Sequence, residues 1–433
     1  MSTLKVNKLR DTAGSADAIT LDPNGGAVLA GVTTITTARV TSGIVTNTFI
    51  VGAGVTISES GIEASGIGIT CANINGTQIG GRRNIIINGA FNVAQRGTSS
   101  TTSGYYTVDR FSNTYSGADE ATTQEQADVT SGTDPYKLGF RKAWKITNGN
   151  QTSGAGAADM LRTMYVVEAQ DIASSGWNYT DSNSFITLQF WIKSSVAQNF
   201  YGQLRSIDGT SQSLSFETGS LTADTWTKVI VSVPGNSNLQ FDMDSNAGLY
   251  IYFFPYNGTD YTDAGVSLNT WSAYASGTRT PVNTTTWYTT NDATLEFTGY
   301  QLEVGSQATA FEHRGYGEEL HLCQRYYVFY PSGYISGGRG GSGGSILLYN
   351  YYLPTPLRGS PTLEPSSAWS SSNGIRAYKY NGQSDSTNTP TLGSGGYIAN
   401  TTFVYVQMGG HSIDDDRVAS FTHNNTLGLN AEL

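Results

Sequence analysis

Hydrophobic and polar positions alternate along many short stretches between residues 84 and 315. In FITLQFWIKSS every second residue is apolar: Ile186, Leu188, Phe190 and Ile192. The stretches WTKVIVSVPG, GLYIYFFPYNG and DATLEFTGYQLEVG are similarly short, and Gly, Asn, Asp and Ser separate them. Period-two alternation places one set of side chains on one face of a strand, and many short strands at regular spacing are typical of packed antiparallel sheets. We predict an all-β chain with a jelly-roll sandwich over residues 84–315.

A different pattern occupies residues 31–83, where Ile or Val recurs between Gly and Thr. Phe49 is the only large ring between Gly31 and Gly81, so these strands cannot close a core alone. Segments that cannot bury an apolar face singly do so by stacking or winding with further copies. We therefore predict an intertwined trimeric β shaft. A flexible Gly/Thr-rich linker is the alternative, which the regular Ile/Val spacing disfavours.

The first thirty residues differ from the shaft, because three of the first ten are basic and STLKVNKL alternates like a short strand. We interpret residues 1–30 as an attachment segment with these apolar contact positions: Leu4, Val6 and Leu9. The start lacks the apolar region of a signal peptide, and no run of 18 apolar residues exists to span a membrane. We expect synthesis in the cytoplasm without secretion or membrane insertion.

The segment YGEELHLCQRYYVFY has a helical pattern, in which Leu320, Cys323 and Tyr327 recur at three to four residues. Glu318 and Glu319 suit the positive end of a first helical turn. We predict a short helix or connector over residues 316–330 that covers an edge of the sandwich.

Beyond the connector, glycines cluster between Gly337 and Gly344, and short strands then recur, among them residues 345–352 and 401–408. Clustered glycines indicate a mobile loop or a tight crossing between chains. The pattern predicts a smaller β tip domain over residues 331–433.

Composition changes the picture mainly through charge. Only 13% of the 433 residues are charged, against about 25% in average domains, while 38% are hydrophobic, which is too much for a disordered chain. Residues 84–320 carry 12 basic and 23 acidic side chains, so 12 − 23 = −11. Binding to a phosphate backbone requires a basic surface, so nucleic acid is excluded as a partner. A surface with so few charges is suited to contacts through ring stacking and hydroxyl groups, which salt does not screen as it screens ion pairs.

No cofactor-binding pattern stands out. Cys71 and Cys323 are too few and too far apart for a disulfide framework or a zinc site, and we predict two buried thiols. The four histidines are in no metal-binding spacing. Asp242 and Asp244 can share a strand face and hold a structural Ca²⁺, but the full loop signature is missing. The run Asp414 to Asp416 indicates a solvated turn or a Ca²⁺ loop rather than a glycosidase pair, because adjacent strand residues point to opposite faces.

Several strings follow one another in a familiar order: NIIINGAFNVAQRGT, YTVDRF, FWIKSS, TWTKVIVSVPG and YQLEVGSQATAFEHRGYGEELHLCQRYY. They resemble a module widespread in tail fibres of tailed bacteriophages, from Asn84 to about Tyr327. The opening STLKVNKLRD and the run VTTITTARVTSGI resemble proximal parts of fibres from phages of marine cyanobacteria. The resemblance implies a homotrimer with a shaft fixed to the virion, a jelly roll like carbohydrate-binding modules, and a tip that meets the host. It also implies core positions for Trp226 and Leu302.

A sugar-binding surface needs flat apolar rings with polar side chains beside them. One loop-like cluster comprises Tyr256, Asn257, Asp260, Tyr261, Asp263, Trp271 and Tyr274. A second lies in the predicted tip: Trp369, Asn373, Tyr378, Tyr380 and Asn381. A single ring is more often packed in a core or an interface than bound to a ligand, so the clusters carry more weight than their members.

These observations favour a non-enzymatic fibre subunit that binds a host polysaccharide or lipopolysaccharide, attaches to other tail or baseplate proteins through its N-terminus, and is released by lysis. No nucleophile, phosphate-binding or dinucleotide motif is present in the sequence. One alternative is a polysaccharide depolymerase, although such chains usually carry a long parallel β-helix. The other is a purely structural capsid fibre or spacer.

Overall fold

The computed structural model describes residues 82–331 throughout and parts of the remaining chain. The described parts outside that range are 8–10, 17–21, 27–29, 48–50, 55–58, 61–64, 333–340, 347–364, 375–378, 391–399, 403–409, 419–423 and 427–433. The chain divides into two compact units, Met1–Cys71 and Ala72–Leu433.

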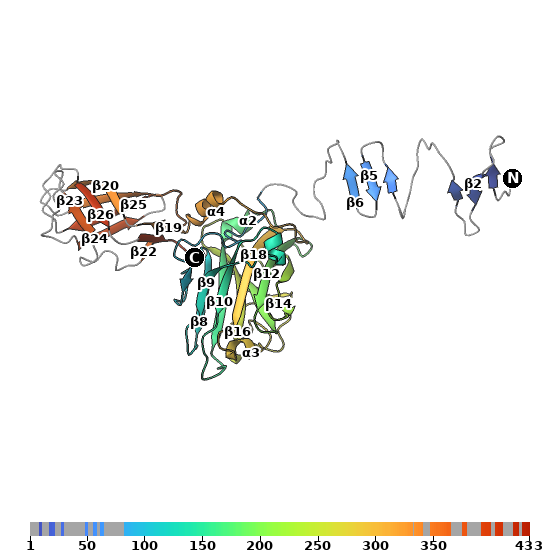
Figure 1. Ribbon diagram of the computed structural model, residues 1–433, viewed down its shortest axis with the longest axis horizontal. Coiled ribbons are helices and arrows are strands. Elements are labelled where there is room, and N and C mark those ends of the chain that lie inside the picture. Colours follow the sequence, from blue (N-terminus) through green and yellow to red (C-terminus); the bar gives the residue numbers. More distant parts are fainter. Residues whose placement is uncertain are drawn as a thin grey trace. The chain divides into compact units, whose positions relative to one another are not determined.

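The first unit contains two small antiparallel sheets, labelled in part in Figure 1. One consists of β1 (Lys8–Arg10), β2 (Asp17–Leu21) and β3 (Ala27–Leu29). The other consists of β4 (Thr48–Ile50), β5 (Val55–Ser58) and β6 (Gly61–Ala64). Short strands therefore form where the Ile/Val pattern predicts them, and Leu9 lies in β1 opposite Ile19. Leu4 and Val6 lie outside the described residues, and the winding of three copies stays a prediction.

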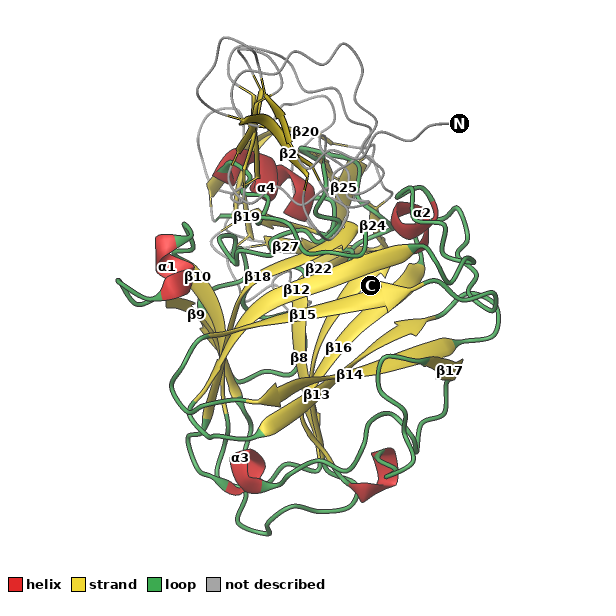
Figure 2. Cartoon of the chain, turned by 90° about the vertical axis from the view of Figure 1, so that its right-hand side faces the viewer, coloured by secondary structure: helices red, strands yellow, loops and turns green. Residues whose placement is uncertain are grey.

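The second unit contains a β-sandwich of two six-stranded antiparallel sheets (Figure 2). Sheet one has the order β15-β12-β18-β10-β9-β7, with bounds Thr227–Pro234, Phe185–Ser194, Thr294–Val304, Lys142–Thr147, Thr123–Asp128 and Ser99–Ser100. Sheet two has the order β17-β14-β13-β16-β11-β8, with bounds Trp271–Ala273, Gln212–Ser220, Asn199–Ser206, Ala247–Asn257, Met160–Glu168 and Phe111–Ser116. From β10 to β13 each successive strand changes sheet, as in a jelly roll. The all-β sandwich is confirmed.

The core lies between the two sheets and follows the predicted alternation. The apolar set of β12 is fully buried: Ile186, Leu188, Phe190 and Ile192. The Phe190 ring stacks on Tyr300 of β18, with ring centroids 4.7 Å apart. Each such side chain stabilises the fold by about 1.5–3 kcal/mol when fully buried. Leu302 is in this core as predicted. Trp226 is not, because it is only partly buried against a separate small cluster around Phe140.

The predicted helix is α4 (Tyr316–Cys323), with both glutamates in its first turn. The Cys323 thiol is free and fully buried, as predicted, whereas Cys71 lies outside the described residues. The helix differs from the prediction in two respects. Glu319 is buried while Leu320 is only partly buried, and the chain leaves the helix before Tyr327, which opens β19 (Tyr327–Tyr330).

The remaining helical turns are short: α1 (Asp134–Lys137), α2 (Ala169–Ala173), α3 (Thr286–Thr289) and the 3₁₀ turn η1 (Thr259–Tyr261). The C-terminal strands form two further sheets. A three-stranded sheet joins β19, β27 (Leu427–Asn430) and β22 (Thr362–Glu364). A six-stranded sheet has the order β23-β26-β20-β21-β25-β24, with bounds Ile375–Tyr378, Ala419–His423, Gly333–Gly340, Leu347–Tyr352, Phe403–Gly409 and Thr391–Ala399. The predicted strands near 345–352 and 401–408 correspond to β21 and β25.

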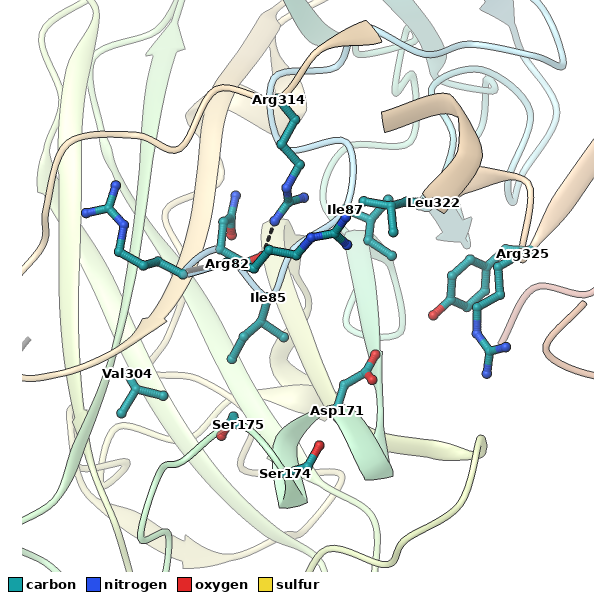
Figure 3. A pocket seen from close by; sticks show the side chains of 13 residues that line it. Arg82, Ile85, Ile87, Asp171, Ser174, Ser175, Val304, Arg314, Leu322 and Arg325 are labelled. Carbon is teal, nitrogen blue, oxygen red and sulfur yellow. Dashed lines mark hydrogen bonds between the residues drawn. The ribbon is translucent and has the colours of Figure 1, made fainter. Parts of the chain in front are cut away.

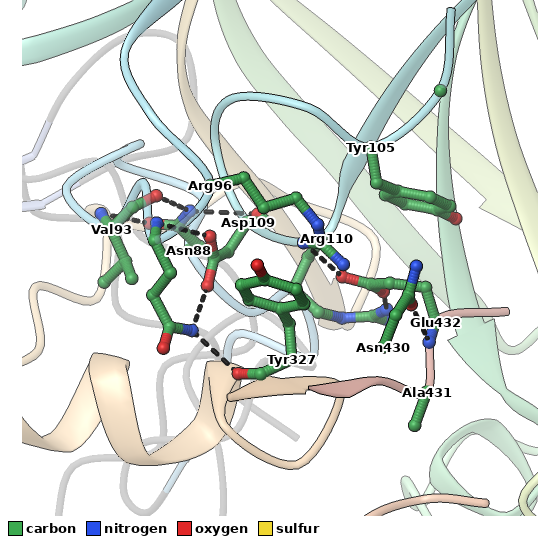
Figure 4. A network of polar contacts seen from close by, with 12 residues as sticks. Asn88, Val93, Arg96, Tyr105, Asp109, Arg110, Tyr327, Asn430, Ala431 and Glu432 are labelled. Atoms are coloured by element: carbon green, nitrogen blue, oxygen red, sulfur yellow. Dashed lines mark hydrogen bonds and ion pairs between the residues drawn. The ribbon is translucent and has the colours of Figure 1, made fainter. Parts of the chain in front are cut away.

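The strings that resemble the fibre module meet in one buried polar network, part of which Figure 4 shows. Asn88 donates its side-chain amide to the carbonyls of Val93 and Asp109 at 2.8 and 3.0 Å. Its backbone N–H donates to Glu319 Oε1 at 2.6 Å. Arg110, next to Asp109, pairs with Glu432 from the last residues of the chain. These residues thus connect the segment before the first sandwich strands, α4 and the C-terminal residues, which is a structural role.

Candidate functional site

The outer face of sheet two carries a continuous stack of three aromatic rings. On β16, Leu249, Ile251 and Phe253 belong to the core. The residues between them, Tyr250, Tyr252 and Phe254, therefore point away from it, since successive strand residues face opposite sides. The Tyr250 and Tyr252 rings are parallel within 5° with centroids 5.3 Å apart, and Phe254 continues the stack at 5.8 Å. Because the ring faces cover one another, Tyr250 and Tyr252 present their edges and hydroxyl groups outward, while Phe254, 1% exposed, closes the buried end of the stack.

Both tyrosine hydroxyls of this stack lack a hydrogen-bond partner among the described residues. Burial raises the pKa of Tyr252 to about 12, so its hydroxyl is neutral at physiological pH and can both donate and accept. Tyr250 is only partly buried. The Tyr252 side chain is 6% exposed, but its hydroxyl is not among the buried polar atoms that lack a partner, so the tip of the ring reaches the surface. The stack therefore presents unused polar groups on a rigid strand.

Two arginines flank the stack from the neighbouring strands. On β13, Arg205 lies opposite Tyr250 in the register of the two strands. Its guanidinium stacks on Tyr274 at 3.4 Å from the ring centroid, and its Nε donates to Ser211 Oγ at 3.0 Å. On β11, Arg162 places its guanidinium 5.4 Å from the Tyr252 centroid, and its Nε donates to Thr114 Oγ1 at 2.9 Å.

A third arginine reaches the same face from the segment between β16 and α3. The Arg279 carbonyl accepts hydrogen bonds from Gln203 Nε2 at 2.8 Å and from Ser215 Oγ at 2.5 Å, which fixes the segment on the outer face. The guanidinium lies 4.5 Å from the Tyr261 ring centroid and contacts Met160 Sδ at 2.9 Å. Ring–guanidinium contacts of this kind stabilise by about 0.5–2 kcal/mol.

Unsatisfied buried groups gather around this segment. Gln203 Oε1, Asn257 Oδ1, Thr262 Oγ1 and Arg279 Nε have no partner among the described residues. Buried polar atoms are normally hydrogen-bonded, and an unpaired one costs about 1–3 kcal/mol. Ordered water or a bound ligand would satisfy them. The outer face of sheet two thus combines free hydroxyls, unpaired polar atoms and three guanidiniums, and we take it as the candidate site.

Three of the residues predicted to bind glycan are buried. Tyr256 is 4% exposed and stacks on Tyr288 at 4.3 Å, within the core. Asn257 is 2% exposed and its amide reaches toward Thr280 Oγ1 at 3.5 Å. Trp271 is 8% exposed and its indole N–H donates to Pro234 O at 2.7 Å. The Tyr256 and Trp271 rings pack in the core between the sheets and the Asn257 amide is enclosed, so none of the three is placed to contact a sugar, which corrects the prediction for them.

The other predicted residues have different surroundings. Asp260 and Asp263 are exposed, while Tyr261 and Tyr274 are partly buried and hold the arginines described above. The second predicted cluster falls outside what the structure describes: Trp369, Asn373, Tyr380 and Asn381 have no described position, and Tyr378 is placed only as the last residue of β23. The tip candidates therefore stay predictions.

Sequence reasoning missed Tyr250, Tyr252, Arg162 and Arg205. A signal for the tyrosines was present in GLYIYFF, where both alternating sets are apolar and one of them is wholly aromatic. A strand with two apolar faces in a two-layer sandwich must turn one of them outward. Nothing in the local sequence marks the two arginines, because a charged residue on a half-exposed strand is ordinary.

Within the described residues no three His, Cys, Asp or Glu side chains converge to hold a metal ion. Asp242 and Asp244 instead serve local turns: the Asp242 N–H donates to Asp208 Oδ2 at 3.0 Å, and Asp244 Oδ1 accepts from the Asn246 N–H at 3.0 Å. Asp414 to Asp416 lie outside the described residues. No described helix has the length and apolar character needed to cross a membrane.

A cavity of about 470 Å³ lies elsewhere on the second unit (Figure 3), and its lining residues include Arg82, Arg83, Arg314 and Arg325. Arg325 forms two hydrogen bonds of 2.8 Å to Glu168, and Arg82 pairs with Glu318 at 2.7 Å. Arg314 donates to backbone carbonyls and approaches Glu319 at 3.4 Å. Arg83 donates to Thr309 and Ala310. Every guanidinium of this cavity is engaged within the chain, so it is a weaker candidate than the outer face.

No protein-family model matches the sequence, and no curated protein matches it. Solved structures similar to the chain include the enzymatically active domain of tailspike protein 4 of bacteriophage CBA120, at 9% identity and a TM-score of 0.27 over 51% of this chain and 21% of that chain. The family 11 carbohydrate-binding module of Clostridium thermocellum, solved with a mixed-linked tetrasaccharide, matches at 11% identity and 0.23 over 50% and 98%. The N-terminal cellulose-binding domain of Cellulomonas fimi β-1,4-glucanase C matches at 10% and 0.24 over 50% and 99%.

Proposed function

We propose that the chain is a fibre subunit of a tailed bacteriophage and that it attaches the particle to its host by binding a surface glycan. The observation that carries glycan binding is the ring stack on β16, whose two tyrosine hydroxyls have no partner in the described protein and are flanked by Arg162 and Arg205. Sugars are recognised by such convergent polar groups set among aromatic carbon. The fibre role rests on the order of the sequence strings that resemble tail-fibre modules.

The proposed assembly is a homotrimer that attaches to other tail or baseplate proteins through residues 1–30. Three copies on one fibre, and several fibres on one particle, convert a weak site into strong attachment because the later contacts are intramolecular. Light scattering of the purified protein at micromolar concentration tests the assembly. A trimer is expected, and a particle of 46.2 kDa, the mass of one chain, contradicts it.

Adsorption is tested with the labelled full-length protein on host cells, with purified host surface polysaccharide as competitor. Tyr250→Ala removes a partly buried ring from the stack and is expected to lower cell binding at least tenfold. Tyr106→Ala removes an exposed tyrosine outside the stack and serves as the matched control. Equal binding of both variants contradicts a glycan site on this face.

The same polysaccharide separates adsorption from the alternatives. Under the proposal the protein binds without releasing reducing ends, because it performs no catalysis. Release of reducing ends, or a fall in viscosity over hours, identifies a depolymerase instead. A spacer is identified if the labelled protein leaves host cells unlabelled while particles lacking it still adsorb.

A further inference from the structure

We infer that the glycan recognised on the outer face of sheet two is acidic, a polysaccharide that carries carboxylate or sulfate groups. This inference rests on the proposed glycan binding and names the chemical class of the ligand. It starts from the guanidiniums of Arg162, Arg205 and Arg279, which lie on one face and have no carboxylate partner among the described residues.

The lack of ion pairs is notable because acidic groups are in excess nearby. Residues 84–320 carry 12 − 23 = −11 charges, so a carboxylate was available to pair with each arginine. Elsewhere in the second unit such pairs form, for example Arg110 with Glu432 and Arg325 with Glu168. On this face the arginines contact only hydroxyls, a thioether and rings. Their charge is left for a group from outside the chain.

The geometry leaves the right atoms unused. The Nε of Arg162 donates to the Thr114 hydroxyl and the Nε of Arg205 donates to the Ser211 hydroxyl, and each hydrogen bond orients its guanidinium plane. The two terminal nitrogens of each guanidinium make no hydrogen bond within the described protein, and they are not among its buried polar atoms without a partner. A guanidinium with two free N–H groups binds a carboxylate or sulfate through two parallel hydrogen bonds.

The spacing of the two arginines favours a polymer. They lie on β11 and β13, the two neighbours of β16 in sheet two, which separates their backbones by about 10 Å across the sheet. They are also offset along β16, because Arg205 lies opposite Tyr250 and Arg162 faces the bulge between Phe253 and Tyr256. Between them stand the tyrosine edges. A ligand that contacts both guanidiniums therefore needs at least two charged groups on one backbone, which an acidic polysaccharide has and a single sugar lacks.

The other charged groups around this face are few. Glu217 lies at the far end of β14, opposite Tyr201, and accepts a hydrogen bond from Asn199 at 2.8 Å. Asp260 and Asp263 are exposed on the covering segment, where Asp263 accepts from the Gly265 N–H. None of the three contacts an arginine of the face. Nucleic acid is the other polyanion, but three cations in a segment of charge −11 give little of the backbone neutralisation it needs.

The test measures binding of the full-length protein to purified host surface polysaccharide before and after chemical reduction of its carboxyl groups and removal of its sulfate. Dextran sulfate and dextran form a second charged and neutral pair, because they share the same sugar backbone. A single-stranded DNA oligonucleotide reports general polyanion binding. We expect the charged form of each polysaccharide to bind at least tenfold more tightly than its neutral form. Affinity for the charged form is also expected to fall as salt rises.

The double variant Arg162→Gln/Arg205→Gln is expected to lose at least tenfold in affinity for the charged form and nothing for the neutral form. Arg162→Lys/Arg205→Lys keeps the charge and recovers part of the loss. The matched control is Arg141→Gln, since Arg141 also stacks on a tyrosine, Tyr136 at 3.9 Å, but adjoins sheet one. This control is expected to bind like the unmodified protein.

The outcomes separate the two levels of the proposal. The acidic ligand is overturned if the charged and neutral forms bind equally and the arginine variants keep the affinity of the unmodified protein. That result leaves the proposed function intact. If the double variant Arg162→Gln/Arg205→Gln has a lower melting temperature but unchanged affinity, the two arginines only stabilise the fold. That result also overturns the acidic ligand. DNA that binds as tightly as the polysaccharide overturns the ligand class. Failure to bind any glycan together with failure to bind host cells refutes the proposed function itself.

Discussion

Arg110 and Glu432 form an ion pair whose side chains are 1% and 4% exposed. Arg110 immediately precedes β8, and Glu432 is the second-last residue of the chain, so the pair joins sheet two to the C-terminus. The Arg110 guanidinium also lies 3.3 Å from the Tyr326 ring centroid and donates to Val166 O at 2.6 Å. Glu432 accepts a second contact from Arg96 at 3.4 Å. The last residues of the chain thus complete a buried polar network beside sheet two.

Removing the negative charge by Glu432→Gln leaves Arg110 buried without its counter-charge, whereas Arg96 keeps Glu364 at 3.5 Å. Breaking a buried pair in this way costs about 3–5 kcal/mol, because the remaining charge cannot regain its hydration. We expect the free energy of unfolding of the sandwich, measured by chemical denaturation, to fall by that amount.

The exposed pair between Asp134 and Lys137 supplies the control, with side chains 67% and 66% exposed. Exposed pairs contribute about 0–1 kcal/mol, so Asp134→Asn is expected to leave stability almost unchanged. Similar stability of both variants would show that Glu432 is not the counter-ion of the network.

Burial raises the pKa of Asp109 in the same network to about 6, from its usual value of 3.8. The folded state therefore binds a proton more tightly at this residue than the unfolded state does. Its contribution to stability is unfavourable above pH 6 and is relieved as pH falls through 6 toward 3.8. The difference of about two units corresponds to about 3 kcal/mol.

Asp109→Asn removes this titration and keeps an oxygen that accepts from the Gln95 N–H. We expect the stability of the variant, relative to the unmodified protein, to increase between pH 4 and pH 7. Unfolding free energies of both proteins at several pH values give this difference directly, because other titrating groups cancel. A difference that is flat with pH contradicts the raised pKa.

The sandwich could be predicted from the sequence because its strands alternate cleanly. In β12 the odd and even positions differ in polarity, so Ile186 and Leu188 were assigned to the core without knowledge of the fold. The helix α4 was likewise visible in its spacing and its two glutamates. The burial of Glu319 was not, because it depends on Asn88, 231 residues earlier in the chain.

The candidate site was harder to predict for a local reason. Along β16, Leu249, Ile251 and Phe253 face the core, and simple alternation would turn Tyr256 outward with Tyr252. The pairing of β11 with β16 shifts by one residue between Leu161 and Thr163, and after this bulge Tyr256 faces the core. A one-residue shift moves a side chain to the other face of a sheet. The sequence carries no signal of that bulge.

Trp271 provides a test of this correction. Its indole packs in the core and donates to Pro234 O, so Trp271→Phe loses one hydrogen bond and some packing. We expect a loss of about 1–3 kcal/mol in unfolding free energy. Affinity for the host polysaccharide, measured by calorimetry well below the melting temperature, is expected to stay the same. A selective loss of affinity without a loss of stability would restore Trp271 as a binding residue.

The hydroxyl groups of Tyr250 and Tyr252 give the sharpest test of how the face binds. Tyr250→Phe/Tyr252→Phe keeps the stacked rings and removes two hydroxyls that have no partner in the described protein, so stability is expected to stay within about 0.5 kcal/mol. Two hydrogen bonds to a ligand contribute about 1–3 kcal/mol in total, so affinity for the host polysaccharide is expected to fall roughly 5- to 150-fold.

Tyr165→Phe is the matched control for this pair, because the Tyr165 hydroxyl accepts a hydrogen bond from the Ile87 N–H at 2.8 Å inside the core. This control is expected to lose about 1–3 kcal/mol of stability and to keep its affinity, the opposite result. If the tyrosine double variant binds as tightly as the unmodified protein, the ring edges and the arginines carry recognition without the hydroxyls. If it unfolds more easily, the hydroxyls have partners within the protein and the face is not free to bind.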